Sequence, residues 1–285
     1  MSHRTTPPRS RGATDHVIDV MRRVHGHDIY GYDPSFLARS IEARSRAAGE
    51  AGLAAYGERL QSDPAEASAL VTSLGIHHSE FFRDPLAFAL LEQRVLPDML
   101  EAQRASGGRE LRVWSAGCAA GQEAYSVTLL LMELSASREE RPRFRVFATD
   151  SSEEHLARAR QGRYSEADLR HVRLAQLRRW FSATGHEHQI ARELRDRVDF
   201  SRYDLLDPDS CCPPASIFGE FDVILCCNLL FYYRHAVRLQ ILDKLQRCLV
   251  PGGVLVTSES EAQIVADMGD VGPYGLHTPL FRKAG

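Results

Sequence analysis

The sequence predicts an α/β fold in which an all-helical N-terminal region precedes a mostly parallel, doubly wound sheet. The first third of the chain carries helix-start signals and no convincing strand. From Leu111 onward, short apolar runs alternate with helical patterns, as in chains that build a parallel sheet. The 285 residues, 44% hydrophobic and 26% charged, are sufficient for a large core and typical of a globular protein.

The N-terminal region is predicted to hold three helices behind a tail. Residues 1–13 have almost no apolar side chains, so we expect them to form a flexible tail. A helix is expected from about Thr14, with one apolar face made of Val17, Val20, Met21 and Val24. Asp33-Pro34 and Asp63-Pro64 are expected to start two further helices, because Asp caps a helix and Pro suits its first turn.

The remainder of the chain is predicted to link to and then build the sheet. Asp84-Pro85 starts a linking helix with an apolar face of Phe88, Leu91, Val95 and Leu96. Strands are expected near 111–116, 144–149, 198–201, 221–226 and 252–257, and helices near 121–135, 152–161 and 234–249. A ligand of such a sheet binds at the carboxyl ends of the strands.

An insertion near 165–197 interrupts this alternation. We expect a basic helix from Ser165 and a turn at 183–186, then either an antiparallel excursion over 188–198 or a helix over 189–197. The predicted domains are therefore the tail 1–13, a helical domain with its linking helix at 14–95, and a sheet domain at 96–285 that holds the insertion.

The most informative stretch runs from Leu111 to Ser126, where an apolar strand enters a loop containing Gly117 and Gly121 before a helix. Glycines here allow a tight turn and close approach of a ligand to the backbone. The next strand ends on Asp150, and an acidic side chain in that place can hold a ribose diol. The spacing is neither G-x-G-x-x-G nor G-x-x-x-x-G-K-[ST], so a cofactor without a pyrophosphate, such as S-adenosylmethionine, is favoured over a dinucleotide. An ordinary strand-to-helix turn is the alternative.

Four blocks, in order, resemble the CheR family of chemotaxis-receptor glutamate methyltransferases. They are Ser79–Pro85, the Trp114–Ser126 loop, Ala148–Asp150 with Gly162-Arg163-Tyr164, and Phe221–Tyr233; Val250–Leu255 and Ser258–Ser260 extend the match. The resemblance covers roughly residues 30–285. It implies a Rossmann-like class I methyltransferase sheet that binds S-adenosyl-L-methionine, with a small inserted subdomain that can contact receptors.

Four positions depart from the family pattern. Residues 77–79 are His-His-Ser, where the family usually has Asn-x-Thr. Residues 121–125 are Gly-Gln-Glu-Ala-Tyr, where the family usually has Gly-Glu-Glu-Pro-Tyr. Asp204-Leu205-Leu206 replaces Asn-Leu-Leu, and Cys227 takes the place of an arginine in Cys-Arg-Asn. The last exchange removes a charge and a planar donor, so it bears on substrate choice or cofactor affinity.

The resemblance also implies site residues. Arg83 and Tyr232 would be catalytic: Arg83 grips a carboxylate of substrate or cofactor, and the Tyr232 hydroxyl lies near the methyl group. The cofactor-binding residues would be His77, Ser79, Arg83, Gly117, Glu123, Asp150, Asp204, Leu205 and Asn228. Glu123 and Asn228 would lie near the amino-acid portion, Asp150 on the ribose, and Asp204 with Leu205 beside the adenine.

Structural roles are open for several of these residues. Arg83 could pair with Asp84 or Glu80, Tyr232 could pack in a core, and Glu123 could cap a helix. Likewise, the arginines on the N-terminal helices could form a basic face for acidic receptor helices or a merely solvated surface; they are Arg22, Arg23, Arg39, Arg44 and Arg46.

The predicted activity is that of a protein-glutamate O-methyltransferase acting on chemoreceptor or receptor-like helices. A carboxylate is already ionised at pH 7, so the reaction requires alignment and desolvation rather than a strong base. This agrees with the absence of a Ser-His-Asp triad or an acid/base carboxylate pair from the motifs. A small-molecule methyltransferase on the same fold and a cofactor-binding adaptor that has lost catalysis are the alternatives.

Composition argues against other partners. A formal net charge of -3 disfavours a general nucleic-acid binder, and no apolar run is long enough for membrane insertion. No secretory signal is recognised, so we expect a cytoplasmic protein. The six cysteines form no C-x-x-C pair and the histidine pairs lack a ligand framework, so no metal is predicted.

Overall fold

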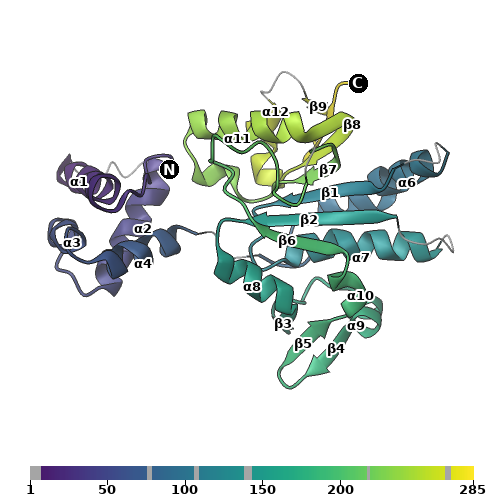
Figure 1. Ribbon diagram of the computed structural model, residues 1–285, viewed down its shortest axis with the longest axis horizontal. Coiled ribbons are helices and arrows are strands. Elements are labelled where there is room, and N and C mark those ends of the chain that lie inside the picture. The colour runs from purple at the N-terminus through teal and green to yellow at the C-terminus, as the bar shows by residue number, and fades with distance from the viewer. Residues whose placement is uncertain (1–7, 76–78, 106–108, 138–142, 217–218, 267–270) are drawn as a thin grey trace. The chain divides into compact units, whose positions relative to one another are not determined.

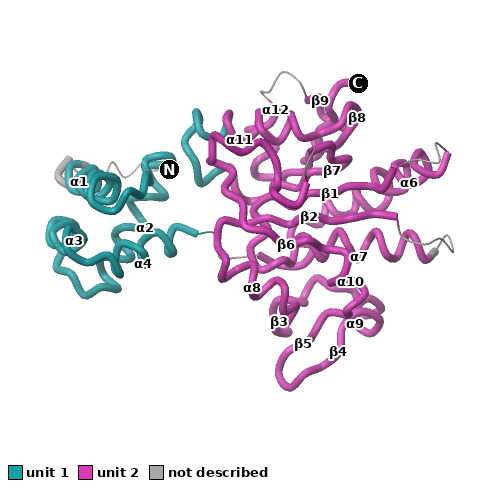
Figure 2. The backbone as a smooth tube through the Cα atoms, viewed as in Figure 1, with its two compact units in different colours: residues 1–76, 231–238 teal, residues 77–230, 239–285 magenta. Residues whose placement is uncertain are grey.

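The computed structural model describes residues 8–75, 79–105, 109–137, 143–216, 219–266 and 271–285. The chain divides into two compact units (Figure 2). Unit 1 consists of residues 1–76 and 231–238, and unit 2 consists of residues 77–230 and 239–285. The segment 231–238 is therefore assigned to unit 1, although its neighbours in the sequence belong to unit 2.

Residues 8–75 of unit 1 form the helices α1 (Pro8–His25), α2 (Pro34–Ala47), α3 (Leu53–Leu60) and α4 (Pro64–Leu74). As predicted, aspartates cap α2 and α4: Asp33 accepts hydrogen bonds from the N–H groups of Ser35 and Phe36, and Asp63 from that of Glu66. Helix α1 begins at Pro8, six residues before the expected start at Thr14, because Pro8 suits a first helical turn. Part of the predicted tail is thus helical, while residues 1–7 lie outside the described residues.

Charged side chains inside unit 1 are paired. Glu66, only 4% exposed, receives a forked pair of hydrogen bonds from Arg44 at 2.7 Å each and a third from the Tyr56 hydroxyl at 2.8 Å. Arg59 pairs with Asp63 and Glu50. Arg44, predicted to lie on an exposed basic face, is therefore occupied in a partly buried ion pair.

Unit 2 begins with a helical segment that contains a wide turn. Helix α5 (Pro85–Leu90) continues through a π turn (Leu91–Val95) into α6 (Leu96–Ala105). The Leu96 N–H donates to the Leu91 carbonyl five residues back. Pro97 follows and has no N–H to give to the helix, which accounts for the irregularity at this point.

A seven-stranded sheet forms the centre of unit 2, with the strand order β6-β2-β1-β7-β8-β10-β9 (Figure 1). Its strands are β1 (Leu111–Ala116), β2 (Phe144–Asp150), β6 (Val198–Arg202), β7 (Phe221–Leu225), β8 (Leu249–Val256), β9 (Val271–Pro273) and β10 (Leu280–Lys283). Strands β6, β2, β1, β7 and β8 are parallel, and β10 runs antiparallel to β8 and β9. The α/β prediction is confirmed, and β1 is the central switch point from which the chain builds outward on both sides.

The predicted helices of the sheet domain are present as α7 (Gln122–Ser137), α8 (Glu153–Gln161) and α11 (His235–Cys248). Short elements follow β8: a 3₁₀ turn (Glu259–Glu261) and α12 (Ala262–Ala266). Among the described residues, no helix is both long and apolar enough to cross a bilayer.

The insertion forms a separate antiparallel sheet of order β3-β5-β4, which Figure 1 shows next to α9 and α10. Its elements are β3 (Arg163–Ser165), α9 (Leu174–Trp180), β4 (Phe181–Thr184), β5 (Glu187–Ile190) and α10 (Arg192–Arg195). The predicted basic helix begins at Leu174 as α9 rather than at Ser165, because Asp168 accepts hydrogen bonds from the Ser165 N–H and hydroxyl and a turn forms there. The predicted antiparallel arrangement is confirmed, and of the alternative helix over 189–197 only the short α10 is present.

Candidate functional site

The loop after β1 adopts the strained backbone that its glycines predicted. Gly117, Ala119 and Gly121 all have positive φ, at 77°, 47° and 91°. The N–H groups of Gly117 and Cys118 both donate to the Thr149 carbonyl at 2.8 Å, which binds the loop to the end of β2. A Cβ added at Gly121 would lie 2.9 Å from that of Ala159, so only glycine fits there.

The Asp150 side chain is hydrogen-bonded to this loop. Its Oδ2 accepts a hydrogen bond from the Ala119 N–H, and its Oδ1 one from the Ser152 N–H, both at 2.9 Å. The Asp150 carbonyl accepts another from the Tyr203 N–H at 3.0 Å, which brings the turn after β6 to the same place. The side chain keeps 13% exposure, and carboxylate oxygens have further lone pairs, so Asp150 can accept from ligand hydroxyls.

Asp204 and Leu205 lie in that turn after β6. Asp204 Oδ1 accepts from the Leu206 N–H at 2.8 Å, so the aspartate shapes the turn with its own side chain. Lys244 of α11 donates to the Asp207 carbonyl at 2.6 Å and holds the turn from the other side. Asp204 and Leu205 are thus adjacent to the strand end that carries Asp150.

Glu123, in the first turn of α7, is a partly buried carboxyl. Its Oε1 accepts from the Ser115 hydroxyl at 2.6 Å, and the Cys227 thiol is its second side-chain hydrogen-bond partner. Burial, reinforced by the negative charges of Asp84 and Glu261, raises the pKa of Glu123 to about 7. The carboxyl is therefore about half ionised at neutral pH.

Two further acids lie around Cys227. Burial raises the pKa of Asp84, and the charges of Glu261 and Glu259 add to the rise, while the Glu259 N–H and the charge of Arg83 oppose it. Burial also raises the pKa of the Cys227 thiol well above its usual value, with the charges of Glu123, Asp84 and Glu261 adding to the rise. Cys227 stands where the family pattern has an arginine, so the carboxyls of Glu123, Asp84 and Glu261 lack the cation that this arginine would supply. The three carboxyls together therefore suit a positively charged ligand.

Glu261 shapes the segment that carries Asn228. It is fully buried and accepts from the N–H groups of Asn228 and Leu230 at 2.6 Å each, and from the Ser258 hydroxyl at 2.7 Å. These bonds hold Asn228 in a left-handed conformation with φ of 58°. Glu261 is not among the residues predicted from the sequence, although Ser258-x-x-Glu261 is a capping-box pattern that could have identified it.

The first motif is anchored to α7 and to the insertion. The Phe82 N–H donates to the Ser126 hydroxyl at 3.0 Å, and Phe82 has a positive φ of 52°. The Glu80 carboxylate binds Arg170 and lies 3.3 Å from the Nε2 of His171. Ser79 and Arg83 are half-buried in this motif, whereas His77 lies outside the described residues.

Tyr232, the other predicted catalytic residue, belongs to unit 1. Its ring packs edge-on against Phe36 with centroids 4.7 Å apart, and its carbonyl accepts from the Asp33 N–H at 2.7 Å. The aromatic packing considered from the sequence is therefore present, and the catalytic role of Tyr232 stays a prediction.

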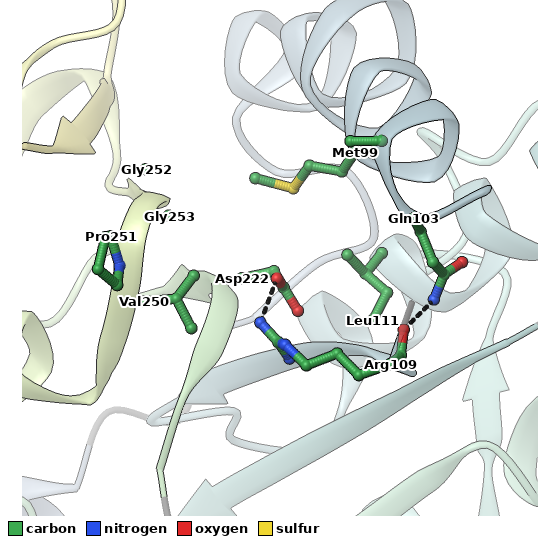
Figure 3. Close-up of a pocket in the computed structure, with 10 residues that line it drawn as sticks. Met99, Gln103, Arg109, Leu111, Asp222, Val250, Pro251, Gly252 and Gly253 are labelled. Carbon is green, nitrogen blue, oxygen red and sulfur yellow. Dashed lines mark hydrogen bonds and ion pairs between the residues drawn. The ribbon is translucent and has the colours of Figure 1, made fainter. Parts of the chain in front are cut away.

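A pocket of about 230 Å³ lies elsewhere in unit 2, at the amino ends of β1 and β7 (Figure 3). There Arg109 pairs with Asp222 at 2.7 Å, and Asp222 also accepts from the Arg112 N–H at 2.8 Å. Gln103 donates to the carbonyls of Arg109 and Arg143. Because these polar groups are engaged with one another, the pocket is a structural junction rather than the cofactor site.

Comparison with known proteins agrees with this geometry. Residues 77–268 match the family model described as "CheR methyltransferase, SAM binding domain". The chain belongs to the CheR methyltransferase family. The match covers the parallel strands of the sheet, the glycine loop and the acids around Cys227, and makes S-adenosylmethionine the cofactor of this domain.

Several relatives are about equally similar. The chain is 32% identical to chemotaxis protein methyltransferase 1 of Pseudomonas aeruginosa over 74% of this chain and 77% of that protein. It is 32% identical to the Escherichia coli chemotaxis protein methyltransferase over 69% of this chain and 64% of that protein. A 104.1 kDa Rhodobacter capsulatus protein is 31% identical over 88% of this chain, which spans only 26% of that longer relative.

The residues present fit the cofactor. The Glu123 carboxyl has only a hydroxyl and a thiol as side-chain donors, which suits a cationic amino or sulfonium group. Asp150 suits a ribose diol, and the glycine loop leaves room for close approach. Among the described residues, no group of three or more His, Cys, Asp or Glu side chains could hold a metal ion.

Proposed function

We propose that this chain is a protein-glutamate O-methyltransferase that forms methyl esters on chemoreceptor or receptor-like sensor helices. Membership of the CheR family supports methyl transfer. Relatives named as chemotaxis methyltransferases support receptor proteins as the substrate. The observation that carries the choice of a carboxylate is Arg83, a half-buried guanidinium in the first motif whose planar fork matches a carboxylate.

The chemistry requires placement more than proton transfer. When bound, S-adenosylmethionine supplies a methyl group on a positively charged sulfur. A glutamate side chain is ionised at neutral pH and can attack without a base, so the protein must align it and exclude water. Arg83 carries a planar, permanently charged fork that matches a carboxylate, and it is our candidate for holding that group.

The cofactor-binding roles follow the same positions. Glu123 would hold the cationic amino-acid portion, with Ser115 and Cys227 orienting its carboxyl. Asp150 would accept from the ribose hydroxyls while the Ala119 N–H fixes it. Asp204 and Leu205 would border the adenine, with Ser79, Gly117 and Asn228 completing the site. His77 and Tyr232 remain candidates from the family resemblance.

The product can be identified chemically. The full chain is incubated with methyl-labelled cofactor and membranes from the native host, and labelled proteins are separated. A carboxyl methyl ester loses its label as volatile methanol in mild alkali, whereas methyl-lysine, methyl-arginine and methyl ethers keep it. We expect alkali-labile label on receptor bands; label that survives alkali refutes the carboxyl assignment.

Two variants separate this proposal from the alternatives. Arg83→Ala is expected to lower single-turnover transfer by at least about tenfold, because a charge-assisted contact contributes about 1.5–3 kcal/mol, with little loss of stability. Unchanged rates would assign Arg83 a structural role. Labelling of free metabolites without receptor indicates a small-molecule enzyme, and cofactor binding without any transfer indicates an adaptor.

A further inference from the structure

A second pocket lies beside β6, the outermost strand on one side of the large sheet. Its volume is about 320 Å³, and side chains from β6, α7, α8 and α10 line it, among them Tyr125, Arg160, Arg192, Arg195, Val198 and Phe200. None of these residues belongs to the proposed cofactor site. Arg160, Arg192 and Arg195 bring three positive charges to this pocket, and a ligand can use only those that no carboxylate already balances.

Two of the three arginines have carboxylate partners. Arg160 pairs with Glu153 at 2.5 Å and donates to the Phe200 carbonyl at 3.0 Å. Arg192 lies 3.4 Å from Asp196. The remaining acid of the lining, Asp199, is bound by Arg145 from the neighbouring strand. Each of these ion pairs has no net charge, so the positive charge of Arg195 is the one that remains unbalanced in the lining.

Arg195 has no carboxylate partner among the described residues, and its Nε is buried without a hydrogen-bond acceptor there. Its stem lies against Gly162, which ends α8 with φ of 63°: a Cβ added at that glycine would lie 3.1 Å from the Arg195 Cδ. Its charge also acts on the nearby Tyr125 hydroxyl, which donates to the Ala159 carbonyl at 2.9 Å. A buried, positioned donor without an acceptor indicates a place for an anionic group.

We propose that this pocket binds a small organic monocarboxylate. One unbalanced guanidinium matches a single negative charge, and its fork matches a carboxylate. Asp196 and Asp199 of the same lining already pair with Arg192 and Arg145, so a single positive charge is left, and the second negative charge of a phosphate dianion would have no partner. Val198 and Phe200 offer apolar surface to the body of the ligand, and the volume falls within the usual range for small-molecule sites.

Benzoate is a suitable probe, with benzamide as its uncharged match. Ligand-observed NMR titrations use the full chain without cofactor. We expect benzoate to bind roughly tenfold more tightly than benzamide, as one charge-assisted pair implies, and more tightly than inorganic phosphate. Arg195→Met keeps most of the stem and should remove the preference for benzoate, whereas Arg178→Met, on the exposed side of α9, should leave it unchanged.

A second variant tests the charge argument if Arg195→Met does not fold. Asp196 is exposed, so Asp196→Asn should fold, release Arg192 and tighten benzoate binding several-fold at low salt. Equal affinity for benzoate and benzamide, tighter binding of phosphate, or no response to either substitution overturns the proposal.

Discussion

The stability of the free protein should depend on the protonation of Glu123. The carboxyl ordinarily has a pKa of 4.5, and burial raises it to about 7 in the folded chain. Between these two values the folded state holds a proton that the unfolded state has released, so stability falls as the pH rises. Its contribution is fully present below pH 4.5 and is lost by about pH 7.

The magnitude follows from the separation of the two pKa values. Each pH unit changes the free energy of unfolding by about 1.4 kcal/mol for one proton, so the interval from 4.5 to about 7 corresponds to roughly 3 kcal/mol. Glu123→Gln removes the titration but keeps an oxygen that can accept from the Ser115 hydroxyl. The stability of the wild type relative to Glu123→Gln should therefore fall by about 2–4 kcal/mol across this interval.

Urea unfolding of both proteins at several pH values between 4.5 and 8 measures this difference. Glu154→Gln, on the exposed face of α8, is the control for loss of one carboxyl, and its curve should run parallel to that of the wild type. Cofactor binding supplies a second readout: if the cation requires ionised Glu123, affinity falls about tenfold per pH unit below 7. Parallel stability curves for wild type and Glu123→Gln would refute the reasoning.

Three other substitutions test separate contacts. Cys227→Arg should lower the pKa of Glu123, so the stability of this variant should depend less on pH than that of the wild type, as measured by thermal unfolding at pH 6 and 8. An unchanged pH dependence means that residue 227 does not act on Glu123. Asp150→Ala should weaken cofactor binding by about 1–3 kcal/mol, and equal affinities by calorimetry would remove Asp150 from the site. Glu66→Gln should destabilise the protein by about 2–4 kcal/mol in urea unfolding, because it breaks the buried pair with Arg44 and Tyr56; a change below about 0.5 kcal/mol contradicts that role.

The parallel core of the fold could be predicted because its signals are local. Each of its strands is a short apolar run, and helices such as α2, α4 and α5 open on an Asp-Pro start signal. Elements without such signals were missed. Helix α3 is surrounded and interrupted by Gly49, Gly52 and Gly57, and β9 holds only three residues, one of them Pro273.

The candidate site was predictable where one strand end determines the position, and less so where distant segments meet. Asp150 and Gly117 follow directly from the ends of β2 and β1. Glu261 acts on Asn228 across 33 residues of sequence, and Glu80 on Arg170 across 90, so only the folded chain brings them together. The raised pKa of Glu123 likewise depends on burial, which no sequence pattern states.

The edge of the large sheet at β6 has a consequence for solubility during folding. An outer strand presents unpaired carbonyls on which another chain can add, and this is a common route to aggregation. Here Arg160 occupies the Phe200 carbonyl, and Arg202 of the same strand turns back to the Ser151 carbonyl. Because the charge of Arg160 is balanced by Glu153, its effect is to block an acceptor: a second copy would meet an occupied carbonyl at Phe200 and the Arg202 side chain at the end of the strand. The arginines thus discourage strand-by-strand assembly of this chain.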